Sequence, residues 1–137
     1  MLSVKNLINT TDLTADDITQ ILDTARSMEE INHRTIKKVP ALRGRTVVNL
    51  FLEPSTRTRS SFEIAEKRLS ADSLNIAGSS SSVSKGECLE DTIKTLDAYG
   101  IDMYVVRAKA AGTAQRITEY TDAHVINAGD GKHAHPT

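Results

Sequence analysis

A run of hydroxyl and guanidinium side chains, Ser-Thr-Arg-Thr-Arg at residues 55–59, is the part of the sequence best suited to chemistry. It follows the apolar run TVVNLFL, which is typical of a buried strand, and precedes a segment whose apolar residues have helical spacing. The backbone N–H groups of a first helical turn have no partner within the helix and attract anions. Hydroxyl donors and two arginines beside them predict a site for a phosphate-like dianion. The run has no glycine, which excludes a nucleotide P-loop.

The same run also fits a purely structural role. A hydroxyl residue commonly caps a helix, and the arginines that follow it then point to solvent. Arg57 and Arg59 are two positions apart and so do not share one helix face. One of them is expected to face a ligand, while the other supports the fold or an interface.

Two further cations follow predicted strands. Lys85 lies in the stretch GSSSSVSKGE, whose composition is that of a flexible linker. As part of a mobile lid, its ammonium group could instead reach a phosphate. Arg107 ends the apolar run IDMYVVR, where it is a second candidate for anion binding. A surface ion pair is the alternative interpretation of Arg107.

The last cluster is NAGDGKHAHPT, in which two histidines stand two residues apart. A neutral imidazole at the carboxyl end of a strand can donate a hydrogen bond to a carbonyl oxygen and polarise it. His135 is the candidate for this role. A metal site is the alternative, but no third ligand has suitable spacing, and Asp130 is explained as a turn cap. We therefore expect no metal.

The elements that must position these clusters alternate between helices and short apolar strands. Residues 14–31 have a helical pattern that begins with a capping box formed by Thr14 and Asp17. The alternation that follows predicts an α/β fold, a parallel β-sheet of about four strands flanked by helices. Because the carboxyl ends of parallel strands share one edge, all four clusters should converge there and form a pocket for a small phosphorylated molecule.

Two of the predicted helices have an apolar face that we expect to be buried. The face of the first helix is formed by Ile18, Ile21, Leu22, Ala25 and Met28. The face of the helix after Pro54 is formed by Phe62, Ile64, Ala65 and Leu69. A short helix is also expected near GTAQRITEY, between the last two strands.

Composition limits the class of protein. The length of 137 residues fits a single domain, and 39% apolar and 26% charged residues are typical of a soluble globular chain. Lys and Arg number 17 against 18 Asp and Glu, so no basic field favours nucleic acid or membrane partners. No apolar run is long enough to span a bilayer. The single Cys88 forms no internal disulfide, and we expect a cytoplasmic protein.

The segments FLEPSTRTRSSFE, SSSVSKGE, DMYVVR and NAGDGKHAHPT, in this order and spacing, resemble the N-terminal domain of the transcarbamoylase family. The resemblance covers essentially the whole chain. The NAGDG…HPT wording is similar to aspartate carbamoyltransferases, since ornithine carbamoyltransferases typically have Cys after HP. The resemblance implies that residues 1–137 form a carbamoyl-phosphate-binding domain for carbamoyl transfer to L-aspartate in pyrimidine biosynthesis. An ornithine carbamoyltransferase domain is the alternative within the family.

The resemblance also implies a role for each cluster. The carbonyl oxygen of carbamoyl phosphate would be contacted by Thr58, Arg107 and His135, and the departing phosphate would be stabilised by Arg57 and Lys85. In the family, the loop serine and lysine act in the neighbouring subunit of a homotrimer, and the acyl transfer needs no cofactor or metal. The catalytic residues would be Arg57, Thr58, Lys85, Arg107 and His135. The substrate-binding residues would be Ser55, Thr56, Arg57, Thr58, Ser82, Lys85, Arg107 and His135.

Two departures from the family pattern modify these expectations. Ala108 follows Arg107, where the family usually has His. The sequence also stops at Thr137, before the Gln that normally follows HPT and before the C-terminal domain that binds aspartate. We therefore expect a truncated form with little transferase activity of its own. The alternative from another class is a non-catalytic module for trimer assembly or for binding a regulatory or pathway partner chain.

Overall fold

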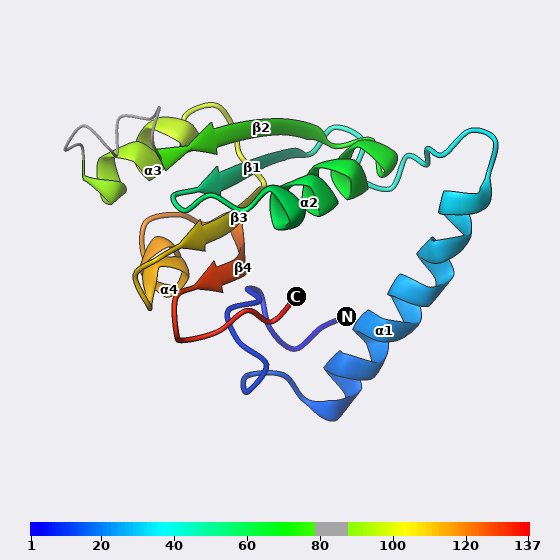
Figure 1. Cartoon of the computed structure of the whole chain (residues 1–137), viewed down its shortest axis with the longest axis horizontal. Coiled ribbons are helices and arrows are strands. Elements are labelled where there is room, and N and C mark those ends of the chain that lie inside the picture. Colours follow the sequence, from blue (N-terminus) through cyan, green and yellow to red (C-terminus); the bar gives the residue numbers. More distant parts are fainter. Residues whose placement is uncertain (79–87) are drawn as a thin grey trace.

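A four-stranded parallel sheet in the order β2-β1-β3-β4 forms the centre of the fold (Figure 1). The structure is a computed structural model and describes residues 1–78 and 88–137. The strands are β1 (Thr46–Phe51), β2 (Asp72–Ala77), β3 (Met103–Ala108) and β4 (His124–Asp130). Strand β1 pairs with both β2 and β3, and β3 pairs with β4. The predicted α/β architecture is confirmed.

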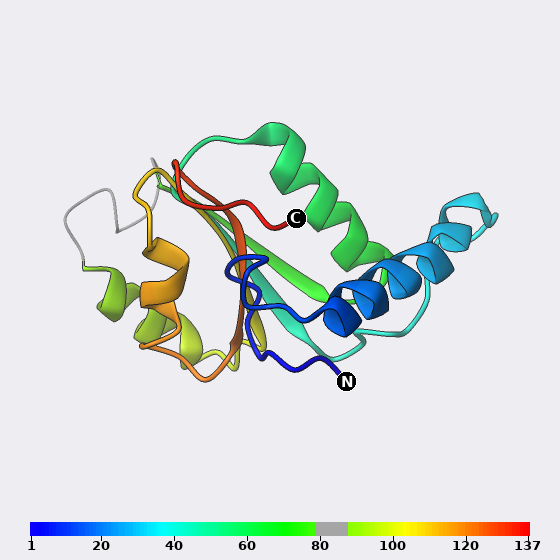
Figure 2. The ribbon, with the colours of Figure 1, turned by 90° about the horizontal axis from the view of Figure 1, so that it is seen from below.

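Helices cover both faces of this sheet. They are α1 (Ala15–Glu29), the short 3-10 helix η1 (Glu30–His33), α2 (Thr56–Arg68), α3 (Leu89–Asp97) and α4 (Thr113–Ile117). Figure 2 shows α2 over one face, α3 and α4 over the other, and α1 beside the sheet rather than on it. In residues 1–78 and 88–137, no helix has the length and apolar character needed to cross a membrane.

Neighbouring residues of the central strands supply two separate apolar clusters, because successive side chains of a strand point to opposite faces. Val48 and Leu50 of β1 belong to the larger cluster, together with Ile93 of α3 and Ile117 of α4. A smaller cluster on the opposite face is formed by Val47, Phe51, Val105 and Ala128, with Phe62 of α2 packed against it. Every strand residue of β1 after Thr46 is buried, as expected for a central parallel strand.

Helix α1 has the predicted capping box but not the predicted burial. The Thr14 side chain accepts a hydrogen bond from the Asp17 N–H, and the Asp17 carboxylate accepts one from the Thr14 N–H. Ile18 and Leu22, expected to be buried, are 40% and 56% exposed. The buried residue of α1 is Asp17, whose carboxylate also accepts hydrogen bonds from Ser3. The expectation of a buried apolar face was wrong because α1 does not lie on the sheet.

Helix α2 packs along a different line from the predicted one. Phe62 contacts the smaller cluster, but Ile64 is 49% exposed and Ala65 is also exposed. The fully buried position of α2 is Glu66, at 5% exposure. Two positions along a helix correspond to about 200° of rotation, so Ile64 cannot follow Phe62 onto the sheet, whereas Glu66, one turn on, does. The helix near residues 112–120 is also shorter than predicted, since α4 ends at Ile117.

Candidate anion-binding site

A cavity of about 650 Å³ lies between the N-terminal half of α2 and the segment that follows β4. The structure brings three of the predicted site residues together here: Arg57 and Thr58 from the first turn of α2, and His135 from the end of the chain. Sequence reasoning did not select four other lining residues, although the two nearest follow Arg57 and Thr58 by one helical turn. These four are Ser61, Phe62, Ala65 and Thr137.

The start of α2 is suited to an anion. Ser55 holds the N-cap position, but its side chain makes no capping hydrogen bond, so the interpretation of Ser55 as an ordinary cap is wrong. Thr56, the first helical residue, is exposed. The first turn of α2 has no acidic residue that would neutralise the positive end of the helix dipole. The positive end of the dipole therefore favours an anion at the start of α2.

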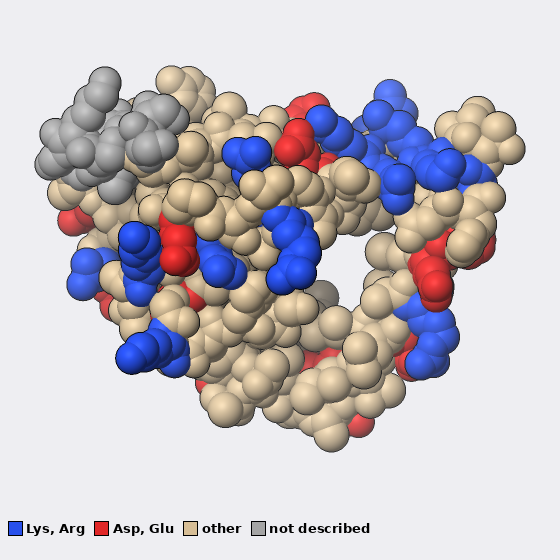
Figure 3. Space-filling model, viewed as in Figure 1, with Lys and Arg blue, Asp and Glu red and all other residues tan. Residues whose placement is uncertain are grey.

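The two arginines of α2 diverge, as their spacing predicts. Arg57 is exposed and lines the cavity. Arg59 is not among the lining residues, and its Nε is buried without a hydrogen-bond partner in the described part of the chain. Figure 3 shows the molecule hollowed between α1 and the rest of the chain, with Lys and Arg side chains on the rim of the hollow.

Arg107 is held at the carboxyl end of β3 and does not line the cavity. Its Nε donates to Oε2 of Glu53 at 3.3 Å, and its Nη1 donates to the carbonyl of Ala128 at 3.0 Å. The ion-pair interpretation is therefore realised in this structure. Sequence reasoning missed Glu53; the available signal was its position two residues after β1, the strand that pairs with β3. Gly129 is required beside Arg107, because its φ is +119° and a Cβ there would lie 2.5 Å from Nη1.

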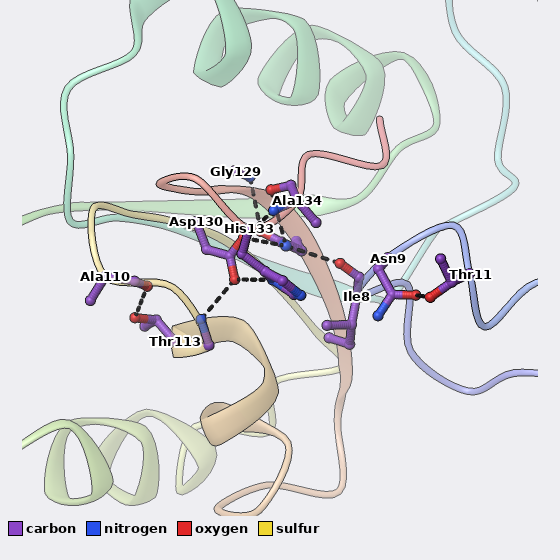
Figure 4. Close-up of polar contacts among 11 residues, drawn as sticks. Ile8, Asn9, Thr11, Ala110, Thr113, Gly129, Asp130, His133 and Ala134 are labelled. Atoms are coloured by element: carbon purple, nitrogen blue, oxygen red, sulfur yellow. Dashed lines mark hydrogen bonds and ion pairs between the residues drawn. The ribbon is translucent and has the colours of Figure 1, made fainter.

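The two neighbouring histidines have different partners. The His135 Nδ1 lies 3.0 Å from Oγ1 of Thr137, and the His133 Nδ1 lies 2.7 Å from Oδ2 of Asp130 (Figure 4). Among the described residues, no group of three His, Cys, Asp or Glu side chains gathers in a way that could hold a metal ion. Ala108, which follows Arg107 in β3, is 2% exposed.

Asp130 is the buried centre of this region. Its carboxylate is 1% exposed and accepts hydrogen bonds from Gly112 N, Asn127 Nδ2, His133 Nδ1 and Ala134 N. Burial raises the pKa of Asp130, but these hydrogen bonds together lower it below its ordinary value. The carboxylate is therefore ionised at neutral pH. Its predicted role as a turn cap is confirmed by the bonds to His133 and Ala134.

Two of the predicted site residues, Ser82 and Lys85, lie outside the described residues. Their interpretation stays a prediction, as does the chemical role of each residue in the cavity. Cys88, which begins the described part again, is exposed and holds the N-cap position of α3.

Comparison with known proteins identifies relatives over nearly the whole chain. The catalytic subunit of aspartate carbamoyltransferase from Halothermothrix orenii is 58% identical over 133 residues, which cover 97% of this chain and 42% of that protein. The corresponding subunit from Streptomyces coelicolor is 58% identical over 135 residues, with 97% and 41% covered. The chain thus spans about 42% of the length of the curated relatives that it matches.

Solved structures agree with these relatives. The catalytic subunit of M. jannaschii aspartate transcarbamoylase matches with a TM-score of 0.87 and 43% identity, covering 97% of this chain and 43% of that one. Aspartate transcarbamoylase from Trypanosoma cruzi in complex with carbamoyl phosphate and aspartate matches with a TM-score of 0.84 and 32% identity, covering 95% and 40%. The profile of the family described as aspartate/ornithine carbamoyltransferase, carbamoyl-P binding domain, matches residues 5–137. The chain belongs to this family.

Proposed function

We propose that this chain is the carbamoyl-phosphate-binding part of an aspartate carbamoyltransferase, an enzyme that transfers a carbamoyl group from carbamoyl phosphate to L-aspartate in pyrimidine biosynthesis. The observation that carries the proposal is the convergence of Arg57, Thr58 and His135 on one cavity at the N-terminal end of α2. A phosphate there meets backbone N–H groups, a hydroxyl and a guanidinium, the donors that anions prefer. The names of the relatives support aspartate rather than ornithine as the acceptor.

In the proposed reaction, the amino nitrogen of aspartate attacks the carbonyl carbon of carbamoyl phosphate. A C–N bond forms, the carbonyl carbon becomes tetrahedral, and its oxygen becomes an oxyanion to which His135 and Thr58 donate hydrogen bonds. The C–O bond to phosphate then breaks, and the phosphate leaves with its electron pair beside Arg57. The nitrogen loses its proton to solvent or to the departing phosphate. Arg107, at the carboxyl end of the neighbouring strand β3, is proposed to contact both the carbonyl oxygen and the phosphate.

The second substrate is proposed to bind elsewhere. The chain spans about 42% of the length of its curated relatives, and we assign aspartate binding to the part of those relatives that the chain does not match. The 137-residue chain assayed alone with both substrates is then expected to turn over slowly. The proposal includes a homotrimer in the cytoplasm, in which Ser82 and Lys85 serve the site of a neighbouring subunit.

Calorimetry with carbamoyl phosphate tests the site. We expect the chain to bind this ligand, and Arg57→Ala to weaken binding about 10- to 100-fold, because the phosphate loses a charge-assisted donor. Arg116→Ala is the matched control, since Arg116 is an exposed arginine of α4, on the opposite face of the sheet. The affinity of Arg116→Ala for carbamoyl phosphate should stay within about twofold of that of the unaltered chain.

The absence of binding heat at millimolar carbamoyl phosphate would contradict the proposal. That result would favour the assembly or partner-binding module instead. Equal losses of affinity in Arg57→Ala and Arg116→Ala would indicate a general electrostatic effect. They would contradict binding of the ligand in the cavity.

A further inference from the structure

Asp130 joins three parts of the chain that meet near His135. Its Oδ2 accepts hydrogen bonds from Gly112 N at 2.9 Å, in the segment between β3 and α4, and from His133 Nδ1 at 2.7 Å. Its Oδ1 accepts from Asn127 Nδ2 at 3.1 Å, within β4, and from Ala134 N at 2.9 Å. Figure 4 shows these contacts gathered around one carboxylate between the end of β4 and the start of α4.

The backbone that leads into His135 is fixed by the same network. Ala134, the residue before it, donates its N–H to the Asp130 carboxylate and accepts from Asp130 N at 3.1 Å. Its carbonyl also accepts from Asn127 Nδ2 at 3.3 Å. Both backbone polar groups of Ala134 are therefore tied to β4. Because His135 follows directly, the place from which its imidazole enters the cavity depends on these bonds.

The network also selects the tautomer of a second imidazole, that of His133. An ionised carboxylate only accepts hydrogen bonds, so the proton of a neutral His133 ring must lie on Nδ1, which faces Asp130. The Nε2 atom is then an acceptor. His133 and His135 both line a second cavity of about 350 Å³, next to Thr10 and Thr11 of the N-terminal segment. Asp130 thereby controls the hydrogen-bonding character of the His133 ring.

We propose that Asp130 is a positioning residue for His135: it clamps the turn of residues 131–134 to β4 and so holds the His135 imidazole at the carbonyl side of the anion site. The inference rests on the proposed function, because the role of His135 at the carbonyl belongs to that proposal. Phosphate binding at α2 does not depend on the clamp, since Arg57 and Thr58 come from another element. The clamp therefore affects carbamoyl phosphate and inorganic phosphate differently.

The variant Asp130→Asn tests this difference by calorimetry with both ligands. The amide replaces one acceptor oxygen by a donor, which then faces donors that it cannot pair with. We expect the affinity for carbamoyl phosphate to fall about tenfold and the affinity for inorganic phosphate to stay within about twofold. Asp122→Asn, the same change at an exposed acid before β4, should alter neither affinity. Equal losses for both ligands in Asp130→Asn would overturn the proposal.

Nitrogen-15 NMR of the histidines provides a readout that does not require binding. In the unaltered chain, His133 should show the Nδ1–H tautomer, and in Asp130→Asn it should change to the Nε2–H tautomer, with shifted His135 resonances. An Nε2–H tautomer in the unaltered chain, or unchanged His135 resonances in the variant, would overturn the proposal. If the unaltered chain binds neither ligand, the proposed function fails, while the NMR result still decides the clamp.

A second variant covers the case in which Asp130→Asn does not fold. His133→Ala removes one of the four bonds to Asp130 and leaves those of Gly112, Asn127 and Ala134. We expect a loss of about two- to fivefold in carbamoyl phosphate affinity, with phosphate affinity unchanged. The same loss for both ligands would again contradict the positioning role.

Discussion

The two faces of the sheet are built from alternate residues of the same strands, but their apolar clusters differ in size. The α3 and α4 face holds the larger apolar cluster, with Val106, Ile93 and Ile117 at 1% exposure or less. The α2 face holds a smaller apolar cluster and, beside it, the buried polar side chains Asn49 and Glu66. The face that carries the anion site thus has the smaller apolar cluster. Most of the hydrophobic stabilisation comes from the opposite face.

The polar cluster under α2 is incompletely hydrogen-bonded. Asn49 Nδ2 donates to Glu66 Oε1 at 2.7 Å and to Asn75 Oδ1 at 2.9 Å, and Ser73 Oγ donates to Glu66 Oε1 at 3.0 Å. Glu66 Oε2 and Asn49 Oδ1 have no partner among the described residues. Burial raises the pKa of Glu66 against the opposing effect of the bonds from Asn49 and Ser73. The α2 face therefore contains a carboxyl group whose charge is unfavourable in the folded protein.

The largest expected effect compares two neighbouring valines. Val105 and Val106 are both 1% exposed, but Val106 faces the larger cluster and Val105 the smaller one. Val106→Ala should lower the free energy of unfolding by about 2–4 kcal/mol, because it removes two methyl groups and leaves a cavity in a closely packed apolar layer. Val105→Ala should cost about 1 kcal/mol less, because the surroundings of Val105 can relax more easily. Urea unfolding measures both.

Equal losses of unfolding free energy in the two valine variants, or a larger loss in Val105→Ala, would contradict the comparison. It would mean that the α2 face is packed as tightly as the α3 and α4 face, in spite of its polar side chains. Circular dichroism of both folded variants is the control, because the comparison requires that each retains the native helix content.

The second effect is a pH-dependent stabilisation by Glu66→Gln. The ordinary pKa of 4.5 applies to Glu66 in the unfolded chain and is raised in the folded protein. As the pH rises above about 4.5, the unfolded state loses the Glu66 proton before the folded state does, so the stability of the unaltered chain falls. A glutamine keeps an acceptor for Asn49 and Ser73 but carries no charge. The variant should be more stable by about 1–2 kcal/mol at pH 8 and of similar stability at pH 4.

Thermal unfolding across this pH range checks the prediction. Glu63→Gln serves as the matched control, because the Glu63 carboxylate pairs with exposed Lys67 and its pKa is lowered by that hydrogen bond and charge. A constant difference between Glu66→Gln and the unaltered chain at every pH would show that the charge of Glu66 is not the cause. The α2 face would then be polar without being electrostatically strained.

The smallest effect is expected on the outer surfaces of the helices. Lys67 pairs with Glu63 on α2 at 2.9 Å, and Lys94 pairs with Glu90 on α3 at 2.6 Å. Both lysines are largely exposed, so solvent screens the pairs. Lys67→Ala and Lys94→Ala should each change the free energy of unfolding by less than about 0.5 kcal/mol in urea titrations. A loss above about 1 kcal/mol in only one of them would show that the two faces also differ in the strength of the ion pairs on their exposed helix surfaces.

Much of the architecture could be predicted from local patterns. The strand segments, the capping box of Thr14 and Asp17, and the helix that begins after Ser55 follow from apolar periodicity and turn chemistry. The positions of Arg57 and Thr58 at a helix start were predicted for the same reason. Glu53 as the partner of Arg107, and Glu66 as the buried residue of α2, were not predicted. Each depends on which neighbouring strand lies opposite, and one-dimensional spacing does not contain that information.

The sequence by itself determined the order of strands and helices and the residue types available to bind an anion, because periodicity and capping act between residues that are close along the chain. Only the tertiary structure decided that His135 meets Arg57 and Thr58 while Arg107 pairs with Glu53. It also decided that the apolar face of α1 stays exposed. These contacts follow from the sheet order β2-β1-β3-β4 and from helix placement, which depend on the packing of the whole chain rather than on any single segment.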